Sequence, residues 1–161
     1  MSIRQTIGRG SLLGVFALAL AACASGPPRR VSEPAASIQQ LTVQANGNWL
    51  VDLRMENFSS VPMRFDAISL PLTLHKLAAG TLQGNAGISI GPESADIVTL
   101  PHVPTVDAKL AMADALSAGR SIGYSLEGTV QAAPEDGKSR LYDIERDSAL
   151  SPVPGLPGVL R

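Results

Sequence analysis

The chain of 161 residues is nearly neutral, with 13 Lys and Arg against 14 Asp and Glu and a formal net charge of −1. It has no basic excess of the kind that nucleic-acid binding requires, which argues against nucleic acid as a partner. Its single cysteine excludes a disulfide framework and a cysteine-based metal site. Hydrophobic residues make up 45% of the chain, enough for one domain with a packed core.

The first 22 residues have the layout of a secretory signal peptide. Arg4 and Arg9 precede a short apolar run over residues 12–20, and small residues follow it. The run is shorter than a transmembrane helix requires. The segment Leu20-Ala21-Ala22-Cys23 resembles the lipobox of bacterial lipoproteins, in which the cysteine is acylated and becomes the first residue of the mature chain. We predict cleavage before Cys23 and membrane attachment through the acylated Cys23; the alternative is an ordinary signal peptide with an incidental cysteine.

The residues after Cys23 predict a location and a tether. Ala24 follows the cysteine in place of an aspartate, and under the usual bacterial sorting rule this predicts the periplasmic face of the outer membrane. Residues 23–37 contain three prolines and few apolar side chains, which predicts a flexible, lipid-anchored linker with a reach of about 40 Å. Arg29 and Arg30 are expected to be solvated in this linker, with contact to anionic headgroups as the alternative.

Residues 38–147 are predicted to form the folded domain, because polar and apolar residues alternate there with the period of two that is typical of half-buried strands. The first hairpin is expected from residues 38–45 and 49–56, joined at Asn46-Gly47, a dipeptide that suits a tight turn. On the second of these strands, one set of alternating residues is expected in the core: Trp49, Val51, Leu53 and Met55.

A long strand is expected over residues 63–77. The apolar residues change phase near Asp66-Ala67, which predicts a β-bulge. Pro71 lacks a backbone donor and predicts that part of this strand lies at a sheet edge. A turn is expected at Ala78-Ala79-Gly80. Further strands are expected at residues 81–90, 95–100, 121–132 and 138–146.

Between these strands, the period changes to that of a helix. Val106, Leu110, Ala113 and Leu116 or Ser117 recur at helical spacing, which predicts a helix with these residues along one face. Thr105 or Asp107 is expected to cap its start, and Gly119 its end. About seven strands and one short helix predict an all-β fold, an antiparallel β-sandwich of the immunoglobulin or fibronectin III type.

Residues 148–161 form an apolar, proline-rich tail. Three prolines, six aliphatic side chains and one charge distinguish it from ordinary disordered tails, which are polar. The prolines also exclude a helix. We expect residues 148–152 to dock on the sandwich itself, and residues 155–161 to bind a partner or to be disordered.

No catalytic, metal-binding or cofactor-binding residue is predicted. Gly119-Arg120-Ser121-Ile122-Gly123 matches the Gly-x-Ser-x-Gly pattern of serine hydrolases, but there a strand leads into the serine and a helix follows. Here the expected order is helix first, and the chain has no histidine after Ser121. His75 and His102, the two histidines, are far apart in sequence and have no Asp-rich cluster beside them. The one predicted site is therefore the lipidation site, Cys23.

Four segments of the predicted domain carry a recognisable pattern: residues 53–62 (LRMENFSSVP), 68–74 (ISLPLTL), 88–98 (ISIGPESADIV) and 124–128 (YSLEG). Together they resemble the late embryogenesis abundant type 2 family, also called the water stress and hypersensitive response domain. The resemblance covers about residues 38–132. The family commonly has Asn-Pro-Asn at its loop, of which this chain keeps only Asn57. The resemblance implies a fibronectin-like sandwich and an association with dehydration and cold stress, without catalytic residues.

Two functions are compatible with these observations. The first is a non-enzymatic, lipid-anchored envelope protein whose sandwich protects or binds other envelope molecules. The second is an adaptor subunit of an envelope assembly, docking to a protein partner through a sheet edge or through the C-terminal tail. A small hydrolase is nearly excluded by the reversed order around Ser121.

Overall fold

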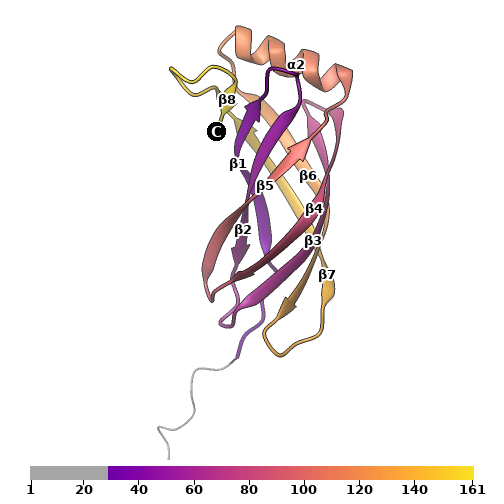
Figure 1. Ribbon diagram of the computed structural model, residues 1–161, viewed down its shortest axis with the longest axis vertical. Helices are drawn as coiled ribbons and strands as arrows, with labels where there is room; N and C mark the ends of the chain where they lie inside the picture. The colour runs from indigo at the N-terminus through magenta and orange to yellow at the C-terminus, as the bar shows by residue number, and fades with distance from the viewer. Residues whose placement is uncertain (1–28) are drawn as a thin grey trace, which may run out of the picture.

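The computed structural model describes residues 29–161, so Cys23 and the predicted leader lie outside the described residues. Two antiparallel four-stranded sheets pack face to face, and the helix α2 (Val106–Ser117) lies across one end of them (Figure 1). The described chain begins at the opposite end. Within residues 29–161, the predicted all-β sandwich with one short helix is confirmed, with seven long strands and a two-residue eighth.

The first sheet has the order β5-β2-β1-β8. Its strands are β1 (Ala35–Val43), β2 (Trp49–Asn57), β5 (Ser94–His102) and β8 (Val159–Leu160). The four alternating residues of β2 that were predicted in the core are all buried. The β1–β2 turn contains Gly47 at a φ of +79°, as the Asn-Gly pair predicts. β1 begins three residues earlier than expected, because Ala36 is itself buried and Ala35–Ser37 pair with β2.

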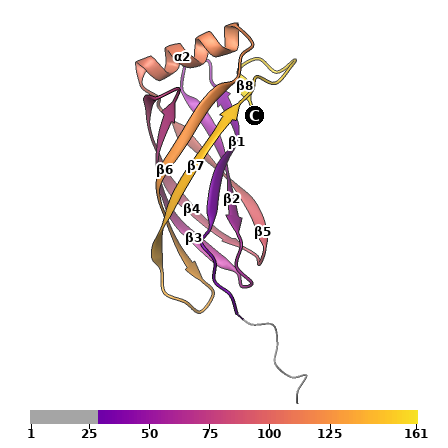
Figure 2. The same ribbon diagram turned by 180° about the vertical axis from the view of Figure 1, so that it is seen from behind.

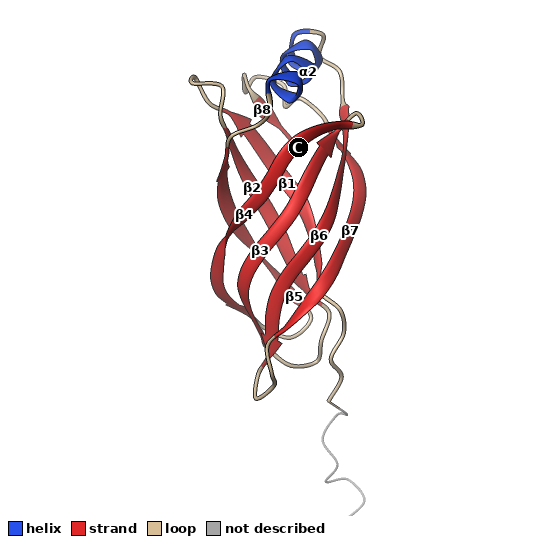
Figure 3. Cartoon of the chain, turned by 90° about the vertical axis from the view of Figure 1, so that its right-hand side faces the viewer, coloured by secondary structure: helices blue, strands red, loops and turns tan. Residues whose placement is uncertain are grey.

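The second sheet has the order β4-β3-β6-β7 (Figure 3). Its strands are β3 (Met63–Leu74), β4 (Leu77–Ile90), β6 (Ile122–Pro134) and β7 (Arg140–Leu150). The predicted bulge is present, since the register of β3 shifts between Phe65 and Ala67 against both of its neighbours. Leu126 and the other large apolar residues of β6 are buried, whereas Glu127 is exposed, as the alternation predicts.

The turn between β3 and β4 is not at Ala78-Ala79-Gly80, and that prediction is wrong. β3 ends at Leu74, and His75 and Lys76 form the turn with φ angles of 49° and 70°. Two central residues with positive φ are the geometry of a tight hairpin turn, which usually contains Asn or Gly. Neither His75 nor Lys76 is Asn or Gly, so the sequence pattern favoured a turn at the small residues Ala78-Ala79-Gly80 that follow.

The expectation that Pro71 marks a sheet edge is also wrong, because β3 lies between β4 and β6. The pairing of β3 with β6 is interrupted between Ser69 and Leu72, so the missing proline donor falls in a gap in the ladder. Gly128 lies beside this gap. A Cβ at Gly128 would be 2.4 Å from the Ser69 carbonyl oxygen and 2.8 Å from Cδ of Pro71. The absence of a side chain at Gly128 therefore lets an interior strand contain a proline.

Helix α2 has the predicted ends, and its buried face is not the one along which the predicted apolar residues recur. Thr105 is the N-cap, its hydroxyl accepting a hydrogen bond from the Ala108 backbone N–H, and Gly119 follows the C-cap with a φ of 62°. The buried residues are Ala108, Met112 and Ala115, whereas Val106 and Leu110 are exposed. The helix is apolar on two sides, so periodicity alone did not identify the side that faces the sheets.

The C-terminal tail belongs to the sandwich. β7 continues to Leu150, which is buried and confirms self-docking of the first part of the tail. The chain then turns back, and β8 pairs with β1 at the helix end (Figure 2). Ser151 and Arg161 exchange two backbone hydrogen bonds of 2.6 and 2.9 Å. Partner binding or disorder of residues 155–161 is therefore wrong for Val159–Leu160, because Leu160 is fully buried in the core.

Candidate functional site

The chain enters the sandwich through hydrogen bonds made by two arginines. The Arg30 guanidinium donates to the Phe58 carbonyl at 2.9 Å and pairs with Glu93 at 3.0 Å. The Arg30 backbone N–H donates to the Ser60 hydroxyl at 2.8 Å, and the Arg29 guanidinium donates to the Glu135 carbonyl. Both arginines are exposed, as expected of solvated charges, but they do not belong to a free linker, because they are hydrogen-bonded to the sandwich. They hold the incoming chain on the loops 58–62, 91–93 and 135–139, which with residues 29–32 form what we call the tether end.

Asn57 connects the loops of the tether end from a buried position. Its side-chain amide donates to the carbonyls of Val61, Ile90 and Gly91 at 2.9, 3.1 and 2.9 Å, and its carbonyl accepts from the Ser59 N–H at 2.9 Å. One side chain thus joins the β2–β3 loop to the β4–β5 turn.

The neighbouring Ser59 continues this connection to the incoming chain. Its buried hydroxyl accepts a hydrogen bond from the Ser32 N–H at 2.9 Å. Asn57 and Ser59 therefore have a structural task, which is to hold three separate segments together. The sequence signal for this was the asparagine at the end of a strand, just before a loop.

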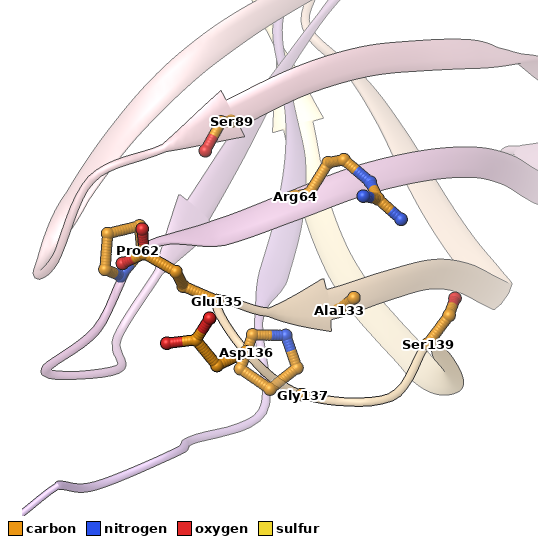
Figure 4. Close-up of a pocket in the computed structure, with 9 residues that line it drawn as sticks. Pro62, Arg64, Ser89, Ala133, Glu135, Asp136, Gly137 and Ser139 are labelled. Atoms are coloured by element: carbon orange, nitrogen blue, oxygen red, sulfur yellow. The ribbon is translucent and has the colours of Figure 1, made fainter.

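A pocket of about 320 Å³ lies beside these loops (Figure 4). Its charged lining residues are Arg64, Glu135 and Asp136. The guanidinium of Arg64 donates a hydrogen bond to the Asp66 carboxylate at 2.8 Å. This hydrogen bond raises the pKa of Arg64, so the side chain stays a cation. Figure 4 shows the Asp136 carboxylate and the Arg64 guanidinium apart rather than facing each other. The one cation in this lining is therefore already paired with a carboxylate outside the lining.

The serine of the Gly-x-Ser-x-Gly pattern lies where α2 ends and β6 begins, so the helix precedes the strand as predicted. The structure adds one juxtaposition that sequence analysis missed. Ser121, His75 and Asp114 all line a pocket of about 250 Å³ next to α2. The Ser121 hydroxyl, however, is hydrogen-bonded to the Ser151 hydroxyl at 2.7 Å, and Asp114 pairs with Arg120 at 2.6 Å. Serine and carboxylate are thus hydrogen-bonded to partners other than the imidazole, an arrangement unlike that of a catalytic triad.

The two histidines lie in different environments. His102 ends β5 and is buried, with Nε2 at 2.8 Å from the Ala79 carbonyl oxygen and its ring centroid 5.7 Å from that of Trp49. Trp49 is buried as predicted, and the two rings pack together in the core. His75 is exposed in the β3–β4 turn. Within residues 29–161, no cluster of three or more His, Cys, Asp or Glu side chains is placed to hold a metal ion.

Apolar side chains gather on the surface at the helix end. Val103, Val106 and Leu110 are 71%, 73% and 65% exposed, and we call these three residues the helix-end patch. Val106 and Leu110 are four residues apart in α2 and so are neighbours on one face of the helix. Scattered exposed apolar residues are normal, whereas neighbouring ones mark interaction surfaces. The sequence identified Val106 and Leu110 as one apolar face, and the structure leaves that face exposed.

No protein-family model matches the sequence, and no curated protein matches it. Solved structures with a similar arrangement include a protein from Bordetella pertussis named ApaA, with 13% identity, a TM-score of 0.47, and coverage of 80% of this chain and 100% of that one. A protein from Arabidopsis thaliana has 13% identity, a TM-score of 0.46, and coverage of 80% and 82%.

A third similar structure is that of a protein assigned to the late embryogenesis abundant proteins. It has 16% identity and a TM-score of 0.45, and the alignment covers 91% of this chain and 79% of that chain. At these values none of the likenesses assigns a family or a function to this chain. Within residues 29–161, no helix is long and apolar enough to cross a membrane.

Proposed function

We propose that this chain is a lipid-anchored, non-enzymatic protein of the bacterial cell envelope, whose β-sandwich binds or protects other envelope molecules. The observation that carries this proposal is the position of the helix-end patch. It lies at the end of the sandwich opposite to the tether end, through which the chain leads back toward Cys23 (Figure 1). A domain anchored by Cys23 would present this apolar surface away from its own attachment point.

The non-enzymatic part of the proposal is supported by what the buried polar groups do. Besides the tyrosines Tyr124 and Tyr142, the buried polar side chains among the described residues are Asn57, Ser59 and His102. Each of these three is hydrogen-bonded to backbone groups that hold strands or loops together. Groups with such structural partners are not poised to move protons or to attack a substrate.

The anchoring part of the proposal predicts that Cys23→Ser releases the protein from membranes. The serine hydroxyl cannot be acylated in place of the thiol, and acyl chains contribute about 0.8 kcal/mol per buried CH₂ group to membrane binding. Fractionation of cells with and without the substitution measures this. Unchanged membrane fractionation of the Cys23→Ser chain would show that the anchor lies elsewhere. A sucrose gradient separates the inner from the outer membrane and tests the proposed outer-membrane location.

The binding part of the proposal predicts that the double variant Val106→Ser and Leu110→Ser loses protective activity. Full burial of one such side chain against a client contributes about 1.5–3 kcal/mol, which two serines remove. The acylated protein on vesicles is mixed with client enzymes, and their aggregation is followed during heating or freezing. Ile97→Ser is the matched control, because Ile97 is an exposed aliphatic residue on β5, away from α2. Equal protection by the unsubstituted protein, the double variant and Ile97→Ser would contradict a role of the helix-end patch.

The second candidate function is an adaptor in an envelope assembly, and two exposed residues favour it. Leu141 on the outer strand β7 and Leu156 in the tail are exposed, at a sheet edge and in the C-terminal segment respectively. An adaptor should bring down a stoichiometric protein partner from detergent-solubilised membranes and should give no protection to unrelated clients. The same pull-down with the double variant Val106→Ser and Leu110→Ser shows which end of the sandwich the partner contacts.

A further inference from the structure

The tether end has exposed apolar side chains of its own. Phe58 is 47% exposed and Val31 is 38% exposed. The segments that carry them lie side by side, because the Arg30 carbonyl accepts a hydrogen bond from the Ser60 N–H at 2.9 Å and the Arg30 guanidinium donates to the Phe58 carbonyl. Phe58 is at the β2–β3 loop between two buried residues, Asn57 and Ser59, so its aromatic ring projects from a loop whose base is firmly held.

The incoming chain is attached to the sandwich only a few residues after Cys23, earlier in the chain than a linker free up to residue 37 would allow. Arg29 and Arg30 are hydrogen-bonded to the tether end, and Ala35 is already in β1. Arg29 follows Cys23 by six residues, which span at most about 20 Å when fully extended. A linker that was free up to residue 37 would have about twice this reach. An acylated Cys23 therefore keeps the tether end within about 20 Å of the bilayer surface, a distance comparable with the headgroup layer plus a few water layers.

We propose that the tether end is a membrane-contact surface on which Phe58 and Val31 insert into the interfacial layer of the bilayer that holds Cys23. This inference rests on the proposed lipid anchor. Aromatic side chains are favoured at the level of the headgroups, where an apolar ring and nearby polar groups are both satisfied. The bilayer is also the one apolar surface that the anchor keeps permanently within reach of Phe58.

A cation beside Phe58 suits a headgroup layer. The side chain of Arg30 is exposed, and its ion pair with Glu93 is a surface pair, which contributes little to stability and so is readily exchanged. A phosphate in the headgroup layer can accept from the same guanidinium. Contact at the tether end would hold the sandwich upright on the membrane. The helix-end patch would then face the aqueous compartment, where the proposed clients or partners are.

The experiment uses the single tryptophan of the chain. Trp49 is buried, so brominated phospholipids should leave the emission of the unsubstituted protein unchanged. The full acylated chain is reconstituted into vesicles of brominated phosphatidylglycerol and phosphatidylethanolamine, as Phe58→Trp and, for comparison, as Leu110→Trp. We expect loss of emission from the added tryptophan of Phe58→Trp and none from that of Leu110→Trp. Both substitutions place an aromatic ring at a position that is already exposed and apolar.

The remaining outcomes separate this inference from the proposed anchor. If the acylated chain floats with the vesicles but neither variant is quenched, the anchor stands and the membrane-contact surface is overturned. Quenching of Leu110→Trp alone would show that the helix end faces the bilayer, and this would also overturn the membrane-contact surface at the tether end. If the unsubstituted chain does not float with the vesicles, the anchor and this inference fall together.

Discussion

Gly128→Ala is expected to cost about 4 kcal/mol or more of the free energy of unfolding, which is a large share of the roughly 5–15 kcal/mol typical of a domain. The added Cβ would lie 2.4 Å from the Ser69 carbonyl oxygen, a backbone atom of the neighbouring strand. It would also lie 3.1 Å from Cα of Leu70, so the contact cannot be relieved by rotating one side chain. β3 and β6 would have to separate at the centre of the second sheet.

Gly123→Ala is the matched control, because Gly123 lies on the same strand. The nearest atom to its added Cβ is the Ser148 carbonyl oxygen at 3.9 Å, an ordinary contact. We expect this variant to stay within about 1 kcal/mol of the unsubstituted protein. Urea denaturation, followed by Trp49 fluorescence, measures both changes. If the two variants have the same unfolding midpoint, the tight contact between β6 and the Pro71 segment does not exist in solution.

Asn57→Asp is expected to be the second severely destabilising substitution, with a cost of about 3–5 kcal/mol at neutral pH. The side-chain amide of Asn57 donates to three backbone carbonyls, and a carboxylate would direct negative charge at the same three oxygens. The site is buried, so water does not reach it to compensate. The carboxyl group would have to take up a proton or the tether end would have to open.

The control for this substitution is Asn85→Asp, which makes the same chemical change at an exposed position of β4. It should alter the unfolding free energy by less than about 0.5 kcal/mol. The Asn57→Asp variant should also recover part of its stability at acid pH, because protonation removes the buried charge. Thermal unfolding of both variants at neutral and acid pH tests the assignment. Equal stability of the two at neutral pH would contradict the hydrogen bonds described for Asn57.

The sequence by itself determined the fold class and most of the core. Alternation along a strand is a local property, because successive side chains point to opposite faces of a sheet. It therefore placed Trp49 and Leu126 in the core and Glu127 on the surface without knowledge of the partner strands. The bulge at residues 66 and 67 and the Thr105 cap are also local, since each depends on a few neighbouring residues. Cys23 as the lipidation site stays a prediction from the sequence alone.

The tertiary structure alone decided how distant segments accommodate one another. Pro71 lies in an interior strand only because Gly128, 57 residues later, leaves it room, and no local pattern contains that pairing. Leu160 is buried because β1 offers it a place beside Leu41, which the composition of the tail did not reveal.

The candidate surfaces depended on tertiary structure in the same way. Val106 and Leu110 were recognisable as one face of a helix, but a helix with two apolar sides can turn either one inward. Ala108, Met112 and Ala115 face inward, and the small alanines allow α2 to lie close against the ends of the sheets. The tether end was assembled from Arg30, Phe58 and Glu93, whose contacts join residues 28 to 63 positions apart. Such contacts depend on the relative positions of loops in space, and the periodicity of a single chain carries no information about them.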